Sequence, residues 1–308
     1  MPPTSLPFPS ATLLGQALAR TASYVTDDRT ALAAWLALAL ERPLLLEGPA
    51  GVGKTDLARA LATTLGRSMV RLQCYEGLDE AKALYEWDYA KQMLYTQLLA
   101  GRVAAETAGT GSIVDAVEKL AGAESAFFGK RFLIARPLLI ALESEVPVVL
   151  LIDEVDRADP EFEAFLLEIL AENQVTIPEL GTIKAAAPPL VILTTNATRD
   201  MTDALRRRCL HAFLDYPPPS REQEILELRV PGIAKALAAE VVHFAAEVRK
   251  LDLRKHPSIA ETIDWARALI MLNASALDKQ TLEATMGVFL KHEEDKKKVA
   301  SALLAKRA

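Results

Sequence analysis

Several features that would mark an extracellular, membrane or polyanion-binding protein are missing from this sequence. Cysteine is rare: the 308 residues contain only Cys74 and Cys209, in unlike contexts and without metal-ligand spacing, which favours two buried thiols in a reduced, cytoplasmic setting. The N-terminus has no basic start followed by an apolar core, so we expect no signal peptide. The longest apolar run, Ala31–Leu40, is about half as long as a membrane-spanning helix, so we expect no transmembrane segment. With 35 basic and 41 acidic side chains, the net charge of −6 gives no general attraction to nucleic acid, and we expect no nucleic acid partner.

What the sequence does contain is enough apolar material for a large core, because 51% of its residues are hydrophobic. Short apolar runs recur along the first two thirds of the chain and are typical of strands buried on both faces. They lie at Pro43–Leu46, Met69–Gln73, Val146–Ile152, Leu190–Thr195 and Ala212–Tyr216. Helical patterns separate them, including one that begins near Thr30 with Asp28 in position to cap it. This alternation predicts an α/β fold, a parallel sheet with helices on both faces.

The organisation of the chain changes after this last predicted strand. Pro217–Pro219 interrupts the chain, and the pattern that follows is helical to the end. We therefore expect an α/β nucleotide-binding domain at 1–216 and a small all-α lid domain at 217–308. Within the first domain, an irregular stretch at about 75–135 is predicted to be an insertion, and turn residues at about 174–185 predict a hairpin.

A glycine-rich loop lies between the first predicted strand and the next helix. It reads Gly48, Pro49, Ala50, Gly51, Val52, Gly53, Lys54 and Thr55, which matches the phosphate-binding pattern G-x-x-x-x-G-K-[ST] in full. The glycines let backbone N–H groups turn toward phosphate oxygens, and the following helix adds the partial positive charge of its N-terminus. Lys54 is predicted to reach the β- and γ-phosphates, and the Thr55 hydroxyl to bind Mg²⁺. We therefore expect ATP and Mg²⁺ as cofactors.

An acidic pair, Asp153 and Glu154, ends the most apolar of the predicted strands and forms a Walker B pattern. Asp153 is predicted to hold the nucleotide and its Mg²⁺ together with Thr55, while Glu154 orients and deprotonates the attacking water. Such a pair is common by itself, but downstream of a complete phosphate-binding loop it predicts hydrolysis as well as binding.

Two further signals complete the candidate site. Asn196 follows a strand expected beside the acidic pair, where its amide could help to position the water, although a lone asparagine at a strand end is more often a turn residue. The arginines Arg206, Arg207 and Arg208 end a short helix and cannot all be paired locally. Arg207 or Arg208 is predicted to act as an arginine finger in a neighbouring subunit's site, the alternative being a solvated helix end.

The loop, the acidic pair, the asparagine and the arginines, in this order and before a helical end, resemble an AAA+ ATPase over nearly the whole chain. Within that class, Asp153–Ala158 (Asp-Glu-Val-Asp-Arg-Ala) resembles the matching motif of the MoxR family. The segments Leu72–Asp79 and Leu84–Trp87 are similar to CoxD-type members of that family.

The resemblance implies a P-loop NTPase that forms a homo-oligomer, a hexameric ring, and uses ATP hydrolysis to remodel a client protein. It also implies a partner protein that carries a von Willebrand factor A domain. The CoxD-like similarity implies a chaperone role in maturing a molybdenum enzyme such as carbon monoxide dehydrogenase. Family members place a sensor arginine in the lid domain, for which Arg254 is a displaced candidate.

Two other functions fit parts of the pattern. A nucleic-acid-handling AAA+ motor or clamp loader would need a basic pore, for which Lys130, Arg131 and Lys184 are the candidates. The acidic net charge disfavours it. A nucleotide-gated scaffold with little turnover is disfavoured by the intact Glu154.

Overall fold

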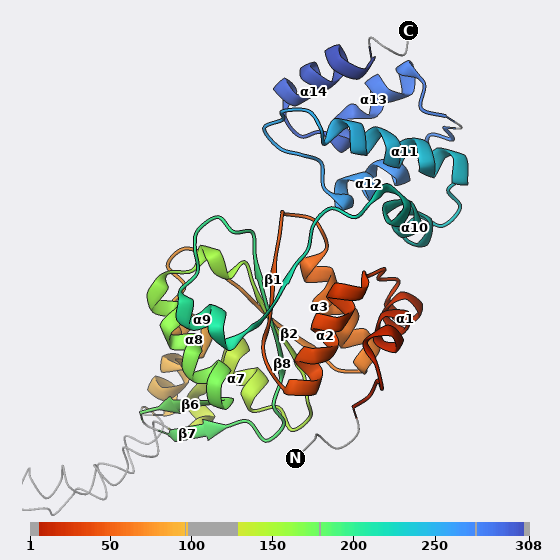
Figure 1. Cartoon of the computed structure of the whole chain (residues 1–308). Coiled ribbons are helices and arrows are strands. Elements are labelled where there is room, and N and C mark those ends of the chain that lie inside the picture. The colour runs from red at the N-terminus through yellow and green to blue at the C-terminus, as the bar shows by residue number, and fades with distance from the viewer. Residues whose placement is uncertain (1–5, 96, 98–128, 179, 275, 305–308) are drawn as a thin grey trace, which may run out of the picture.

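The computed structural model describes residues 6–95, 97, 129–178, 180–274 and 276–304 (Figure 1). Of the insertion predicted at about 75–135, the described part therefore consists of 75–95, 97 and 129–135, and the remainder lies outside the described residues. An α/β body holds the N-terminal part of the chain, and a group of helices follows it.

The body is built on a sheet of parallel strands in the order β2-β5-β8-β1-β9. These strands are β1 (Leu44–Glu47), β2 (Met69–Gln73), β5 (Val149–Asp153), β8 (Leu190–Thr195) and β9 (Leu210–Phe213). Because the strands are parallel, the loops that follow β1, β5 and β8 leave the same edge of the sheet. The phosphate-binding loop, the acidic pair and Asn196 therefore meet at one place.

Helices cover both faces of this sheet, as Figure 1 shows. One face carries α1 (Ala11–Ala22), α2 (Asp28–Leu40) and α3 (Lys54–Leu65), and the other carries α7 (Pro137–Leu142), α8 (Pro160–Glu172) and α9 (Asp203–Arg208). Successive strand residues alternate between the two cores: Leu44 and Leu46 pack toward α1–α3, whereas Leu45 packs toward α7 and α8. The predicted parallel α/β fold with helices on both faces is confirmed.

The last strand starts earlier than its predicted range of Ala212–Tyr216. Leu210 pairs with Leu44 of β1, and the polar His211 that interrupts the apolar pattern belongs to the strand. β9 is an edge strand, so His211 can keep its side chain half-exposed and place its Nε2 3.0 Å from the Glu47 carboxylate. An apolar run alone could not locate this start.

The cap of α2 also differs from the expectation, since Asp27 and not Asp28 accepts the hydrogen bond from the Thr30 backbone N–H, at 2.7 Å. The helix begins one residue earlier than the apolar pattern indicates, which moves its cap by one position. Burial acts to raise the pKa of Asp27, but the hydrogen bonds from Thr30 and the nearby Arg221 outweigh it and lower that pKa.

The chain also forms two small two-stranded sheets. β3 (Tyr85–Trp87) pairs with β4 (Leu133–Ala135); α4 (Glu80–Ala83) comes just before β3, and the turn η1 (Lys130–Phe132) comes just before β4. β6 (Gln174–Ile177) and β7 (Gly181–Lys184) form an antiparallel hairpin after α8, and the turn η2 (Val155–Arg157) follows β5.

The helical part has its own apolar core. It contains α10 (Pro219–Arg229), α11 (Lys235–Val248), α12 (Ile259–Met271), α13 (Lys279–Phe289) and α14 (Glu293–Val299), followed by the π-helical turn Ala300–Leu304. Trp265 stacks on Phe289 with ring centroids 4.6 Å apart, and its indole N–H donates to the Thr285 hydroxyl at 2.8 Å. The buried pair Arg249–Glu222, at 2.6 Å, joins α10 to the end of α11.

Both cysteines are free and buried, and burial raises the pKa of each thiol to about 12. The prediction of two buried thiols is therefore confirmed. Within the described ranges, no helix has the length and apolar character needed to cross a membrane.

Candidate functional site

The phosphate-binding loop Gly48–Thr55 connects β1 to α3, and two of its glycines are required by close packing as well as by backbone conformation. Gly48 has φ of 152°, and a Cβ at this position would lie 1.9 Å from the Leu214 carbonyl oxygen. Gly51 has φ of 77°, and a Cβ there would lie 2.3 Å from the Cβ of Ser258, which caps α12. The loop is therefore held between the end of β9 and the helical part.

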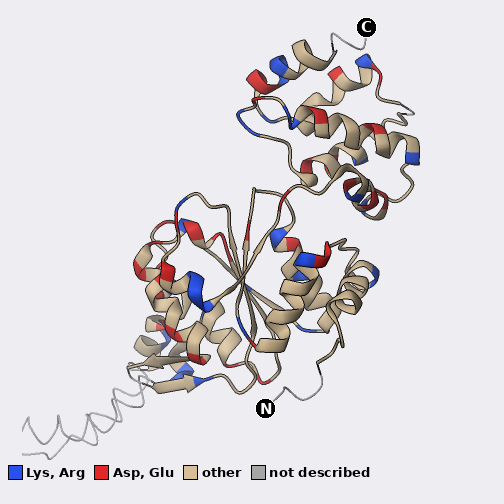
Figure 2. Cartoon of the chain, viewed as in Figure 1, with Lys and Arg blue, Asp and Glu red and all other residues tan. Residues whose placement is uncertain are grey.

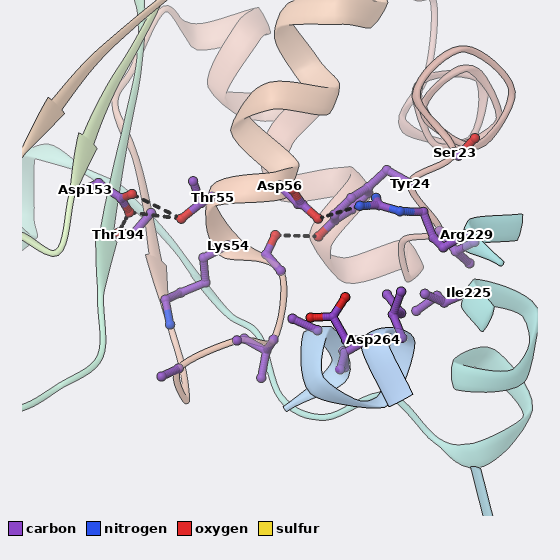
Figure 3. A pocket seen from close by; sticks show the side chains of 18 of the residues that line it. Ser23, Tyr24, Lys54, Thr55, Asp56, Asp153, Thr194, Ile225, Arg229 and Asp264 are labelled. Carbon is purple, nitrogen blue, oxygen red and sulfur yellow. Dashed lines mark hydrogen bonds and ion pairs between the residues drawn. The ribbon is translucent and has the colours of Figure 1, made fainter. Parts of the chain in front are cut away.

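Lys54 folds back into this loop (Figure 3) and is only 6% exposed. Its Nζ donates to the carbonyl oxygens of Gly48 at 2.6 Å and Pro49 at 2.8 Å, and to Asn196 Oδ1 at 2.9 Å. Burial lowers the pKa of Lys54, and the charges of Asp153 and its acidic neighbours oppose that shift. The Lys54 ammonium is thus held in the loop by oxygen acceptors, and phosphate oxygens could take the place of these acceptors.

The Asp153 carboxylate lies beside the first turn of α3 and is 3% exposed. The Thr55 hydroxyl donates to its Oδ1 at 3.1 Å and Oδ2 at 3.2 Å, and the Thr194 hydroxyl donates to Oδ1 at 2.6 Å (Figure 3). Mg²⁺ prefers oxygen ligands such as hydroxyl and carboxylate oxygens, so Thr55 and Asp153 fit this ion. No group of three or more His, Cys, Asp or Glu side chains among the described residues could hold a metal ion. A cation at this place would therefore take its other ligands from a nucleotide and water.

Glu154 is held in one orientation beside Asp153. Its backbone adopts the left-handed conformation, with φ of 56°, which is unusual for a residue other than glycine. Its N–H donates to the Thr194 hydroxyl at 2.8 Å. One carboxylate oxygen accepts from Gln73 at 3.0 Å and from Arg157 at 3.1 Å. The side chain remains one-third exposed, so water can reach it.

Asn196 joins the two halves of the site. Its Oδ1 accepts from Lys54, and its Nδ2 lies 3.4 Å from the Glu154 carboxylate. The loop that carries it is fixed by Asp156, whose Oδ2 accepts from the Asn196 backbone N–H at 3.2 Å and from the Thr198 N–H and hydroxyl at 3.0 and 2.7 Å. This anchoring could not be predicted from the sequence, where Asp156 is only one residue of the Asp153–Ala158 motif.

We expect the anchor to show itself in the pH dependence of stability. Burial acts to raise the pKa of Asp156, but the hydrogen bonds from Thr198 and Asn196 lower it below the ordinary value of 3.8. A carboxyl whose pKa is depressed in the folded state stabilises the fold above its unfolded pKa, and this contribution is lost as the pH falls through the folded pKa. Asp156→Asn should therefore lower the free energy of unfolding by about 1–3 kcal/mol at neutral pH.

The measurement is urea unfolding from neutral pH to below the ordinary pKa, with the exposed Asp200→Asn as the matched control. The difference between wild type and Asp156→Asn should shrink with acidification, while Asp200→Asn follows the wild type. A difference that stays constant over this pH range would show that the bonds to Asp156 contribute nothing through its charge.

A cavity of about 350 Å³ lies between the phosphate-binding loop and the helical part (Figure 3). Ser23, Tyr24 and Val25 also line it, and the partly buried Tyr24 places its hydroxyl 3.4 Å from the Gly53 carbonyl oxygen. The wall that faces the loop comes from α10 and α12 and consists of Ile225, Arg229, Ile259, Ala260, Ile263, Asp264 and Arg267. The cavity thus offers an apolar part and a charged part next to the loop.

Two arginines of this wall, Arg229 and Arg267, are not singled out by any sequence motif. Arg229 lies 3.4 Å from the Asp56 carboxylate, and Arg267 lies 3.3 Å from that of Asp264. Arg254, the candidate for a sensor arginine, is not among the lining residues and is exposed. The sequence did not point to Arg229 or Arg267 because the packing of α10 and α12 against the body is not a local signal.

The arginines of α9 lie on the face of the sheet opposite to α3 (Figure 1), and Figure 2 shows the basic end of this helix in blue. Arg206 is 3.7 Å from the Glu47 carboxylate. Arg207 and Arg208 are exposed, do not line the cavity and take part in no ion pair within the described part of the chain. Arg42 donates to the carbonyl oxygens of both, at 2.9 and 3.1 Å, and so fixes the end of α9.

Comparison with known proteins identifies the family of this chain. A family model described as "AAA domain (dynein-related subfamily)" matches residues 43–209. The chain is 29% identical to the chaperone protein ClpB of Corynebacterium diphtheriae over 63% of its own length, but it spans only 21% of that protein. It is 24% identical to NorQ of Paracoccus denitrificans, covering 70% of this chain and 67% of NorQ. An uncharacterized protein of Staphylococcus saprophyticus is 25% identical over 92% of this chain and 97% of its own. A mutant of RuvB from Thermotoga maritima is a solved structure with a TM-score of 0.48 and 19% identity, covering 94% of this chain and 73% of RuvB.

Proposed function

Since the chain belongs to the dynein-related subfamily of AAA domains and is an ATP-hydrolysing enzyme, we propose that its hydrolytic site is the meeting point of β1, β5 and β8. In this proposal the loop Gly48–Thr55 binds the phosphates of ATP. Thr55 and Asp153 hold Mg²⁺, which neutralises charge on the phosphates when bound. Glu154 accepts a proton from the attacking water. Asn196 fixes the positions of the Glu154 carboxylate and the Lys54 ammonium relative to each other.

One observation carries this proposal: Asn196 contacts both Lys54, at 2.9 Å, and Glu154, at 3.4 Å. The cation expected at the γ-phosphate and the base expected at the water are therefore tied to one amide. Catalysis of phosphoryl transfer is mainly a matter of positioning and charge, so a rigid link between these two groups supports hydrolysis at this site.

The test is the affinity for nucleotide. Lys54→Ala removes the ammonium that would hydrogen-bond the β- and γ-phosphates, and charge-assisted bonds of this kind are worth enough to weaken ATP binding by about tenfold to a hundredfold. Fluorescent ATP titration should detect this loss, and Lys82→Ala, which removes an exposed lysine outside the cavity, should bind as the wild type does. Equal affinities for the Lys54→Ala and Lys82→Ala variants would contradict the assignment of the loop.

We propose further that the protein is a MoxR-type chaperone that acts in the cytoplasm as a hexameric ring, with a client protein and a partner carrying a von Willebrand factor A domain. A CoxD-like role in maturing a molybdenum enzyme is the specific form of this proposal. Similarity to ClpB, which is a chaperone by name, and to NorQ supports the general role.

The described residues do not favour the nucleic-acid motor. Lys130 is paired with Glu143 at 2.8 Å, and the Arg131 guanidinium lies over the Phe132 ring. Basic and acidic residues alternate over the helices in Figure 2. Anisotropy of labelled DNA at low salt should therefore show no binding at micromolar protein concentrations.

A further inference from the structure

A positively charged side chain donates hydrogen bonds to one oxygen of Asp153, the carboxylate that is expected to bind the metal. Arg71 lies on β2, and its Nη2 and Nε donate to Asp153 Oδ2 at 2.6 and 3.1 Å. The same Nη2 donates to Gln73 Oε1 at 2.5 Å. Both of these guanidinium nitrogens converge on Oδ2, whereas Thr194 donates to Oδ1 and the Thr55 hydroxyl lies within hydrogen-bond distance of both oxygens.

The strand register brings Arg71 to this place. β2 runs parallel to β5 as the edge strand of the sheet, with Gln73 opposite Asp153 and Arg71 opposite Leu151. Side chains two residues apart on a strand share a face, so Arg71 lies on the face that Leu151 and Asp153 present to α3. It reaches along the strand to the carboxylate beside Thr55.

The two partners of this ion pair differ in freedom. The Asp153 side chain is 4% exposed, whereas that of Arg71 is 46% exposed and ends on the open edge of the sheet. The Asp153 carboxylate is fixed in the interior, whereas the Arg71 guanidinium is already partly hydrated and can move into solvent without being desolvated. A guanidinium and a divalent cation at one carboxylate oxygen also repel each other, which solvent screens only in part at a half-exposed site.

We propose that Arg71 competes with the divalent cation for Asp153 and thereby lowers the metal affinity of the nucleotide-bound site. This inference rests on the proposed function, because it takes Asp153 as the metal-binding carboxylate. In the metal-free protein Arg71 satisfies Oδ2, and binding of Mg²⁺ with a nucleotide requires the guanidinium to withdraw from that oxygen.

The opposite role, in which Arg71 positions Asp153 for the metal, makes the opposite prediction. Removing a positioning residue weakens metal binding, whereas removing a competitor tightens it. The sign of the change therefore decides between the two roles.

The experiment measures Mn²⁺ binding to the full chain in the presence of ADP by electron paramagnetic resonance, which reports affinity without turnover. Arg71→Ala and Arg71→Gln should each bind Mn²⁺ about two- to fivefold more tightly than the wild type, as expected for loss of a half-exposed ion pair. Arg71→Lys should fall between, because one ammonium keeps the charge but not the two-nitrogen contact. Two neutral variants guard against a folding defect in one of them.

The matched control is Arg157→Ala, which removes an arginine from Glu154 and leaves the contacts of Asp153 intact. It should change the Mn²⁺ affinity by less than either neutral Arg71 variant. Affinity for ADP in EDTA should be the same for wild type and all Arg71 variants.

Unchanged or weaker Mn²⁺ binding by both neutral Arg71 variants would overturn the inference, as would an equal effect of Arg157→Ala. Asp153→Asn separates this failure from failure of the proposed function. If Asp153→Asn weakens Mn²⁺ binding while the Arg71 variants do not tighten it, only the competition is wrong. If Asp153→Asn binds Mn²⁺ as the wild type does, the metal assignment itself is wrong.

Discussion

Arg208→Ala should bind ATP with unchanged affinity and hydrolyse it about 10³–10⁵-fold more slowly, the range known for arginines that complete a neighbouring site. The reason is geometric. Arg208 is exposed at the end of α9, on the opposite face of the sheet from α3, and does not line the chain's own cavity. A charge at this position can stabilise the transition state only in another subunit. Steady-state turnover and ATP titration of the same preparation measure the two effects, and Arg207→Ala identifies which arginine acts.

Subunit mixing tests whether the arginine acts in trans. Wild-type turnover per subunit should rise with protein concentration if the proposed ring assembles. Mixing Arg208→Ala with Glu154→Gln should restore part of the activity, because some interfaces then combine an intact arginine with an intact Glu154. Arg206→Ala is the matched control, since its guanidinium faces Glu47 of its own chain and its loss should have a much smaller effect. Turnover that is independent of concentration, without rescue on mixing, would show that the site is complete within one chain.

Glu154→Gln should lower turnover by about 10²–10⁴-fold, as removal of a general base does, while ATP and Mg²⁺ remain bound. Glutamine has the same shape, so the contact with Asn196 and the strained backbone at this position can persist. Asp153→Asn should instead shift the Mg²⁺ concentration that half-maximal turnover requires. Single-turnover hydrolysis and nucleotide retention on a desalting column separate the two variants.

A Glu154→Gln variant that turns over at the wild-type rate would remove Glu154 from the catalytic role. If the expected result is obtained, the same variant is also the form with which to isolate the proposed client, because it should keep ATP bound. Proteins that co-purify with it in ATP but not in ADP are then the candidates for the client and the partner.

The strands and the loop between β1 and α3 could be predicted because their signals are local. A complete phosphate-binding pattern and buried apolar runs occupy a few consecutive residues, and parallel pairing then brings the acidic pair and Asn196 together. The Arg71 contact could not be predicted in this way. It depends on β2 pairing with β5 in one register, and a shift of one residue would turn Arg71 to the other face.

The wall of the cavity that α10 and α12 form could not be predicted for a different reason. Arg229 and Arg267 lie on helices whose amphipathic patterns tell only which face packs inward, not where one helix sits on another body. The cap of α2 was missed by one residue, between Asp27 and Asp28, because both are good caps and only the helix start decides. The motifs that carry the chemistry could be predicted from the sequence, whereas the position of the C-terminal helices on the α/β body could not.

Gly51 of the phosphate-binding loop lies directly against Ser258, the residue that caps α12. The helix has 13 residues, Ile259–Met271, and at 1.5 Å per residue it is about 20 Å long. A tilt of about 5° at Ser258 moves the far end by about 1.7 Å on that length. That end carries Met271 and Leu272, which are 82% and 61% exposed. Because Ser258 leaves no room for a side chain at Gly51, we expect a displacement of α12 at this exposed end to change the packing of the phosphate-binding loop.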